Sequence, residues 1–172
     1  MESRELPGRS RQVGPQEPSS LESWTLEVTG LVSSPRTLTV AGVSRLGAPL
    51  HADGGVNCPE GFATTRGDWS GVSLLAVMEA VQPRLDARYV SIHSGDFVAA
   101  FRLESMDRRG AVLATALNGR PIPWSVGGPI RLVPSSGACF DTVKWVQRIS
   151  FDPDGSAATA LEIVRARRGN ET

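Results

Sequence analysis

Short segments with the two-residue period of a β-strand dominate this sequence, and they limit the fold more than any other feature. In residues 24–32, Trp24, Leu26 and Val28 alternate with polar neighbours, and Gly30 lies where the pattern ends. This alternation is typical of a strand with one buried face. The same reasoning predicts a partner strand at 36–43 and further strands at 89–93, 97–103, 130–133, 144–151 and 159–164.

One segment shows the period of a helix convincingly. Residues 73–81 carry apolar side chains at helical spacing, with Ser70 or Ser73 available as the cap and Pro83 as the stop. Residues 111–118 fit a short helix or a strand, because alanine and leucine dominate and periodicity does not decide between them. Strands in runs with one firm helix favour an α+β fold over a doubly wound parallel sheet.

The length and composition predict one domain between two short tails. The chain has 172 residues, of which 40% are hydrophobic, and this is enough for one substantial core. Residues 1–20 contain prolines, glycines and charges but almost no apolar side chains, so they are predicted to be a flexible tail. We expect the domain at residues 21–165 and a C-terminal tail at 166–172.

Charge and hydropathy restrict the classes of binding partner that we expect. Eighteen basic and eighteen acidic residues balance, so no long-range field recruits nucleic acid. No apolar run approaches the roughly 20 residues of a membrane helix, and we expect no direct membrane insertion. The first residues lack the apolar stretch of about 7–15 residues in a secretory signal, which predicts a cytoplasmic location. Lys144 is the only lysine in the chain.

Cys58 lies in the run Val56-Asn57-Cys58-Pro59-Glu60-Gly61. A thiol beside proline and glycine is expected on a fixed loop rather than in an apolar core, and this placement suits a metal ligand. A disulfide with Cys139 is not favoured in a reducing compartment. A zinc site built from both cysteines and both histidines, His51 and His93, lacks the close paired spacing of structural zinc sites.

Three further motifs follow Cys58 in order. They are Trp69-Ser70-Gly71-Val72-Ser73-Leu74, then Gly128-Pro129-Ile130-Arg131-Leu132-Val133-Pro134, then Val143-Lys144-Trp145. Together with the Cys58 loop, they resemble the molybdopterin-binding domain of the sulfite oxidase family, over roughly residues 24–152. The pattern through Glu60 and Phe62 is similar to the cysteine loop of the family's bacterial methionine sulfoxide reductase branch. The resemblance implies a sulfite oxidase-type fold of mixed β-sheets with few helices.

The resemblance also implies roles for the residues of the Cys58 loop. Cys58 would bind molybdenum directly, as the protein ligand of a molybdenum–molybdopterin cofactor. Glu60 would be catalytic, as a hydrogen-bond partner of the metal's oxygen ligands or as a proton relay, although a solvated loop glutamate is an equal alternative. Asn57 would offer a donor and an acceptor to the cofactor, or simply occupy a turn.

The remaining expected cofactor contacts come from two later segments. The segment His93-Ser94-Gly95-Asp96-Phe97 resembles a family loop that approaches the pterin, which implies roles for Ser94 and Asp96. Lys144 would contact the phosphate end of the pterin, and Thr142 would donate a hydroxyl hydrogen bond there. The Trp69 motif is interpreted as a packed loop that opens the helix, in which the tryptophan anchors the loop, Gly71 permits the turn, and Val72 and Leu74 enter the core.

Two positions depart from the family pattern. Asp141 stands where a basic residue is usual, and Val126 stands where many relatives carry histidine. The arginines of a sulfite pocket cannot be assigned to Arg66, Arg102 or Arg131, so sulfite is not supported as the substrate.

The resemblance therefore implies a molybdopterin-dependent oxidoreductase. It would transfer an oxygen atom to or from a small-molecule substrate and exchange electrons with a separate electron-transfer partner protein. The main alternative is a non-catalytic accessory or binding module that retains the fold, which Asp141 and Val126 favour and Cys58 and Glu60 oppose. A thiol-based redox protein that uses Cys58 and Cys139 is a third hypothesis, and it would require the two sulfurs to lie close together.

Overall fold

Two five-stranded sheets form the framework of the computed structural model, which describes residues 14–54, 65–105, 110–134 and 141–163. Sheet 1 has the order β2 (Arg36–Thr39), β1 (Thr25–Gly30), β10 (Arg148–Asp152), β5 (Tyr89–Ser94) and β6 (Phe97–Arg102). Sheet 2 has the order β3 (Leu50–Ala52), β4 (Trp69–Ser73), β7 (Val112–Leu117) and β8 (Arg120–Pro121), and β9 (Arg131–Val133) pairs with β7. The β1–β10 pair is parallel, and the other strand pairs are antiparallel.

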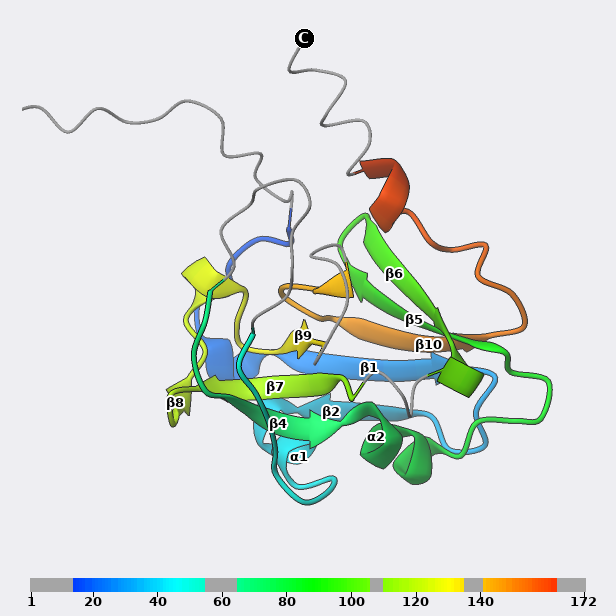
Figure 1. The fold of residues 1–172 in the computed structure, drawn as a ribbon, viewed down its shortest axis with the longest axis horizontal. Helices are drawn as coiled ribbons and strands as arrows, with labels where there is room; N and C mark the ends of the chain where they lie inside the picture. Colours follow the sequence, from blue (N-terminus) through cyan, green and yellow to red (C-terminus); the bar gives the residue numbers. More distant parts are fainter. Residues whose placement is uncertain (1–13, 55–64, 106–109, 135–140, 164–172) are drawn as a thin grey trace, which may run out of the picture.

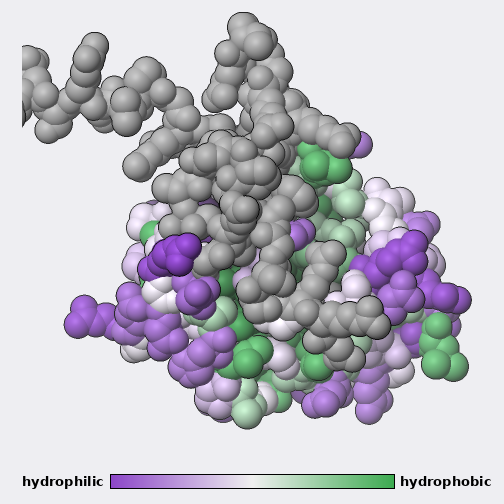
Figure 2. All heavy atoms as spheres, viewed as in Figure 1, coloured by the Kyte–Doolittle hydropathy of each residue, from purple (hydrophilic) through white to green (hydrophobic). Residues whose placement is uncertain are grey.

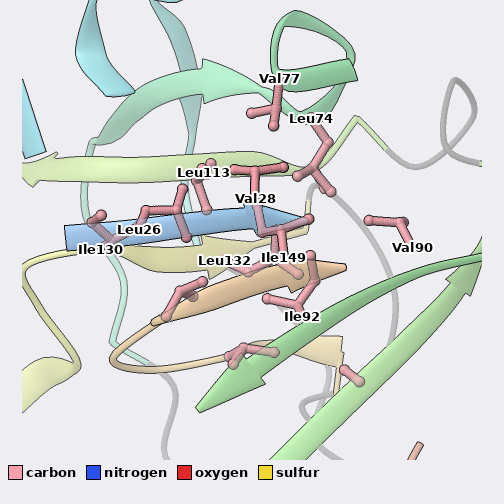
Figure 3. Close-up of a cluster of buried hydrophobic side chains, with 14 of the residues drawn as sticks. Leu26, Val28, Leu74, Val77, Val90, Ile92, Leu113, Ile130, Leu132 and Ile149 are labelled. Atoms are coloured by element: carbon pink, nitrogen blue, oxygen red, sulfur yellow. The ribbon is translucent and has the colours of Figure 1, made fainter. Parts of the chain in front are cut away.

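The main core lies between the inner faces of the two sheets (Figure 1). Leu26, Val28 and Ile149 from sheet 1 meet Leu113 and Leu132 from sheet 2 in one cluster, and all five are 0% exposed (Figure 3). Strand alternation explains the arrangement, because every second side chain of β1 points the same way. A second, smaller cluster covers the outer face of sheet 2, with Trp69, Val112, Ala114, Ile122 and Val133.

Helix α2 (Leu74–Val81) covers one end of the main core, as predicted from its periodicity. The Ser73 side chain accepts a hydrogen bond from the backbone N–H of Ala76 and caps the first turn. The helix ends at Gln82, whose φ of 53° is left-handed, directly before Pro83. Shorter helical elements are α1 (Val40–Ser44), η1 (Leu21–Ser23), η2 (Leu103–Ser105) and η3 (Trp124–Val126).

The structure confirms an α+β fold with mixed sheets and few helices, and it places 111–118 mainly in strand β7. Hydrophilic residues cover much of the described surface in the view of Figure 2, with smaller apolar areas between them. No helix within the described ranges is long and apolar enough to cross a lipid bilayer.

Four local predictions are wrong. The predicted strand 36–43 ends at Thr39, because the Thr39 side chain caps α1 through the N–H of Gly42. The predicted strand 144–151 begins only at Arg148, because Trp145 has a left-handed backbone. Residues 160–163 are helical rather than extended. The Trp69 motif forms strand β4 rather than a loop at the helix start.

Candidate functional site

Arg131 is a buried cation on the outer face of sheet 2. It lies in β9 opposite Ala114 of β7, and its neighbour Leu132 points into the main core. The Arg131 residue is only 6% exposed, and its guanidinium carbon lies 4.8 Å from the ring centroid of Trp69. Its Nη1 donates a hydrogen bond of 2.7 Å to the carbonyl of Val126. The side chain is therefore held on a fixed aromatic platform.

The guanidinium is incompletely satisfied in this position. Burial lowers the pKa of Arg131 to about 10, because the charged form loses its hydration. The Nε atom is buried and has no hydrogen-bond partner among the residues that the structure describes. Buried donors are normally paired, so an unpaired guanidinium nitrogen indicates a place where an acceptor can bind.

Lys144 brings a second cation to the same region. The backbone N–H that follows it, on Trp145, donates to the carbonyl of Gly127 over 2.8 Å. The Lys144 side chain runs so close to Gly127 that a Cβ there would lie within 2.7 Å of the lysine Cβ. Burial and, second, the charge of Arg131 lower the pKa of Lys144. The positive charge of Arg131 therefore acts on the Lys144 ammonium group.

These two cations have no acidic partner among the ion pairs that the described residues form. Those pairs are His51–Asp68, Arg84–Asp86 and Arg102–Glu104. Two neighbouring positive groups that have lost part of their hydration create a strong local preference for an anion. The Arg131–Lys144 pair is therefore the candidate site, and the ligand that its chemistry fits is anionic.

Trp69 connects this pair to the chain segment that contains Cys58. Its indole Nε1 donates to the carbonyl of Thr65 over 3.1 Å, and Gly54 packs against the same nitrogen. Gly54 has a φ of 69° and no room for a Cβ, so glycine is required there. Gly54 and Thr65 are the described residues on either side of 55–64, and the predicted site residues Asn57, Cys58 and Glu60 lie outside the described residues.

The other predicted contacts are placed as follows. Ser94 ends β5, is 0% exposed and has an Oγ without a hydrogen-bond partner, whereas Asp96 is exposed in the β5–β6 turn. Gln147 links this turn to the Lys144 segment, because its N–H donates to the His93 carbonyl and its Oε1 accepts from Gly95. Thr142 is partly buried, just before Val143. In the described part of the chain, no recorded contact joins Ser94 or Asp96 to the Arg131–Lys144 pair.

Sequence reasoning left Arg131 unassigned and interpreted Trp69 only as packing. One signal could have found the arginine, since it is the single charge inside the apolar run Ile130-Arg131-Leu132-Val133. A charge in a strand that is buried on both faces requires a specific partner.

A second polar cluster lies on the outer face of sheet 1. Ser150 donates to Asp152 over 2.9 Å, so His93 Nε2–H donates to Ser150 Oγ, also over 2.9 Å. The remaining His93 nitrogen, Nδ1, accepts from Arg148 over 3.4 Å. Burial and then Arg148 lower the pKa of His93, and Asp152 opposes them. We call these four residues the His93 network.

Comparison with known proteins identifies the family. Residues 13–159 match the family model "Oxidoreductase molybdopterin binding domain". The chain is 29% identical over 106 residues to nitrate reductase [NADPH] of Fusarium oxysporum, which aligns 57% of this chain with 12% of that protein. It is 26% identical over 132 residues to the uncharacterized oxidoreductase YuiH of Bacillus subtilis, with 76% of this chain and 66% of that protein covered.

Two further similarities extend this result. The chain is 27% identical over 144 residues to the protein-methionine-sulfoxide reductase catalytic subunit MsrP of Gluconobacter oxydans, covering 73% of this chain and 46% of that protein. The fold matches the sulfane dehydrogenase SoxCD from Paracoccus pantotrophus with a TM-score of 0.68 at 20% identity, covering 83% of this chain and 41% of that chain. This chain thus spans only part of these relatives. It belongs to the family of oxidoreductase molybdopterin binding domains, as its sequence motifs indicated.

Proposed function

We propose that this chain binds a molybdenum–molybdopterin cofactor and acts as a molybdenum-dependent oxidoreductase that transfers an oxygen atom to or from a small substrate. The observation that carries the proposal is the pair of buried Arg131 and partly buried Lys144, which has no acidic partner among the described ion pairs. Family membership supports the cofactor, and the Cys58 motif supports a protein ligand for the metal.

The described residues fit an anionic cofactor. Molybdopterin carries a phosphate at one end, and Arg131 offers a buried, unpaired Nε for such a group. Lys144 adds a second positive charge. Burial and the charge of Arg131 both disfavour its protonated form, and a bound anion would offset both effects. Trp69 supplies a fully buried ring behind Arg131, which keeps water away from that side. We infer that Arg131 and Lys144 bind and orient the phosphate end.

The reaction end of the cofactor is assigned to Cys58 and Glu60. When bound, the cofactor supplies a metal that changes oxidation state while the oxygen atom is transferred. Cys58 would hold the metal as a thiolate, and Glu60 would hold or move a proton. Trp69 supports this arrangement indirectly, because Gly54 and Thr65, which flank the segment, both contact its indole nitrogen.

The proposal includes a separate electron-transfer protein, because a reaction that changes the oxidation state of the metal needs a source or acceptor of electrons. The relatives are named for nitrate, methionine sulfoxide and sulfane sulfur, so these three make the first substrate panel. The cytoplasmic location stays a prediction.

The test is elemental analysis for molybdenum with pterin fluorescence, on protein expressed in a host that makes the cofactor. We expect near-stoichiometric metal in the wild type. We also expect loss of metal and of activity on the substrate panel in Cys58→Ser, with an unchanged circular dichroism spectrum. Cys139→Ser is the matched control and should keep its metal. A folded wild type without molybdenum and pterin would overturn the proposal, and an active Cys58→Ser variant would overturn the ligand assignment.

A further inference from the structure

The segment that carries Lys144 departs from regular strand pairing. Val143 and Leu132 exchange two backbone hydrogen bonds, of 3.2 and 2.8 Å. A regular antiparallel register would next pair Ile130 with residue 145, but the N–H of Val146 donates to the Ile130 carbonyl instead, over 2.9 Å. One extra residue is therefore accommodated here, as in a β-bulge.

The bulge depends on an unusual backbone conformation. Trp145 has a φ of 51°, and among the described residues only Gln82 and Asn118 share a positive φ without being glycine. A left-handed conformation is unfavourable for a bulky L-residue and persists only where its surroundings hold it. Gln82 ends a helix and Asn118 occupies a hairpin turn, which are ordinary places for it. Trp145 occupies neither.

Three hydrogen bonds and a ring contact hold Trp145 in place. Its N–H donates to Gly127 over 2.8 Å, and its indole Nε1 donates to the carbonyl of Trp124 over 2.9 Å. The rings of Trp145 and Trp124 lie 5.4 Å apart. The indole of Trp24 donates to the carbonyl of Val146 over 2.8 Å. The conformation is thus fixed from both sides.

The left-handed residue fixes the backbone directly after Lys144, where the Trp145 N–H donates to the Gly127 carbonyl. Val143 and Val146 are both 0% exposed although they are three positions apart, so Lys144 and Trp145 form the outward part of the segment between them. The lysine stem then crosses Gly127, next to Val126, whose carbonyl binds Arg131. Regular pairing would instead turn residue 146 away from the core.

We propose that Trp145 is a positioning residue whose left-handed backbone directs Lys144 toward the anion that Arg131 binds. The inference rests on the proposed function for the identity of that anion, but the placement of Lys144 is a property of the protein without cofactor. The ring of Trp145 does not need to touch the ligand. Its contribution is to stabilise a backbone conformation that most side chains would abandon.

Trp145→Gly and Trp145→Ala separate the backbone from the ring. The Lys144 Nζ lies 5.6 Å from the centroid of the Trp145 ring. Both variants lose this contact together with the indole, but glycine adopts positive φ freely and alanine does not. Lys144 is the only lysine, so ¹⁵N labelling of lysine side chains gives one ammonium signal that reports its pKa. In the cofactor-free protein, we expect the lowered Lys144 pKa to persist in Trp145→Gly. In Trp145→Ala, it should return toward the ordinary value.

Binding of inorganic pyrophosphate to the same proteins, measured by calorimetry, gives a second reading. We expect Trp145→Ala to bind roughly 5- to 30-fold more weakly than Trp145→Gly, which corresponds to the cost of a left-handed alanine. Trp24→Phe keeps a ring but removes the hydrogen bond to Val146, and it should shift the Lys144 pKa in the direction of the alanine variant. If Trp145→Ala does not fold, the comparison of wild type with Trp24→Phe tests the positioning role instead.

The two proposals fail in different ways. Equal Lys144 pKa values in the glycine and alanine variants, or in wild type and Trp24→Phe if the alanine variant does not fold, would overturn the positioning role. If the pKa values differ as expected but no variant or wild type binds pyrophosphate, positioning stands and the anion site of the proposed function is wrong.

Discussion

The two polar clusters on the outer sheet faces differ in how completely their groups are paired. In the His93 network on sheet 1, Asp152, Ser150, His93 and Arg148 form one continuous chain of hydrogen bonds. On sheet 2, Arg131 keeps a buried nitrogen without a partner and faces another cation, Lys144. A completed network stabilises a fold, whereas an incomplete one reserves binding capacity for a ligand. The Ser91 and Ser94 hydroxyls are also buried without a partner among the described residues, so the site is distinguished by an unpaired group that carries a charge.

The largest expected effect is on anion binding at the incomplete cluster. Arg131→Met should weaken pyrophosphate binding about 10- to 150-fold, because hydrogen bonds to charged groups contribute roughly 1.5–3 kcal/mol. The stability of the folded protein should stay the same or rise, since an incompletely paired buried charge is removed. Calorimetric titration and urea denaturation measure the two quantities. Arg148→Met is the matched control and should bind the anion as the wild type does.

A smaller effect is expected at the complete network. His93→Leu removes the donor to Ser150 and the acceptor for Arg148, and it should reduce the free energy of unfolding by about 1–2 kcal/mol. Anion affinity should not change. The comparison between the clusters would fail if His93→Leu weakened pyrophosphate binding as much as Arg131→Met does.

The two clusters should also depend on pH in different ranges. The His93 network should affect stability at acidic pH, and Lys144 should affect anion affinity at alkaline pH. Because the folded-state pKa of His93 is lowered, the unfolded chain takes up a proton first as the pH falls below 6.5. Stability from this group is therefore complete above pH 6.5 and is lost on acidification. Urea denaturation at several pH values should show this slope in the wild type and a weaker one in His93→Gln.

The smallest expected effect concerns Lys144 at high pH. Its lowered pKa means that the ammonium loses its proton earlier than an ordinary lysine, so anion affinity should fall as the pH rises through that lowered value. Lys144→Arg should differ by only a few-fold at neutral pH and keep its affinity in alkaline buffer. A wild type whose affinity follows the arginine variant at every pH would contradict a role for the lysine charge.

Sequence patterns predicted the strands that have one buried and one exposed face. They failed where specific contacts determine the backbone conformation. β1 alternates cleanly because only one of its faces is buried. β4 does not alternate, since Trp69 and Val72 serve the two different cores and a register shift separates Ser70 from Gly71. The turn at Trp145 depends on Trp24 and Gly127, which are distant in sequence, and no local pattern contains that information.

The same contrast between local sequence patterns and contacts of distant residues applies to the candidate site. Lys144 was predicted by resemblance, because it belongs to a short motif. The pairing of Arg131 with Lys144 and Trp69 arises only when β9, β4 and the 143–146 segment come together. Three-dimensional proximity of this kind cannot be obtained from spacing along one chain.

The strand order of sheet 1 has a consequence for synthesis of the protein. β10 is the last strand among the described residues, yet it lies in the middle of the sheet, between β1 and β5. Sheet 1 therefore cannot close on the ribosome until residues 148–152 have emerged, and such long-range pairing makes folding slow. The Lys144 segment emerges immediately before them. A nascent chain that stops short of β10 should stay sensitive to protease, and cofactor loading should follow translation rather than accompany it.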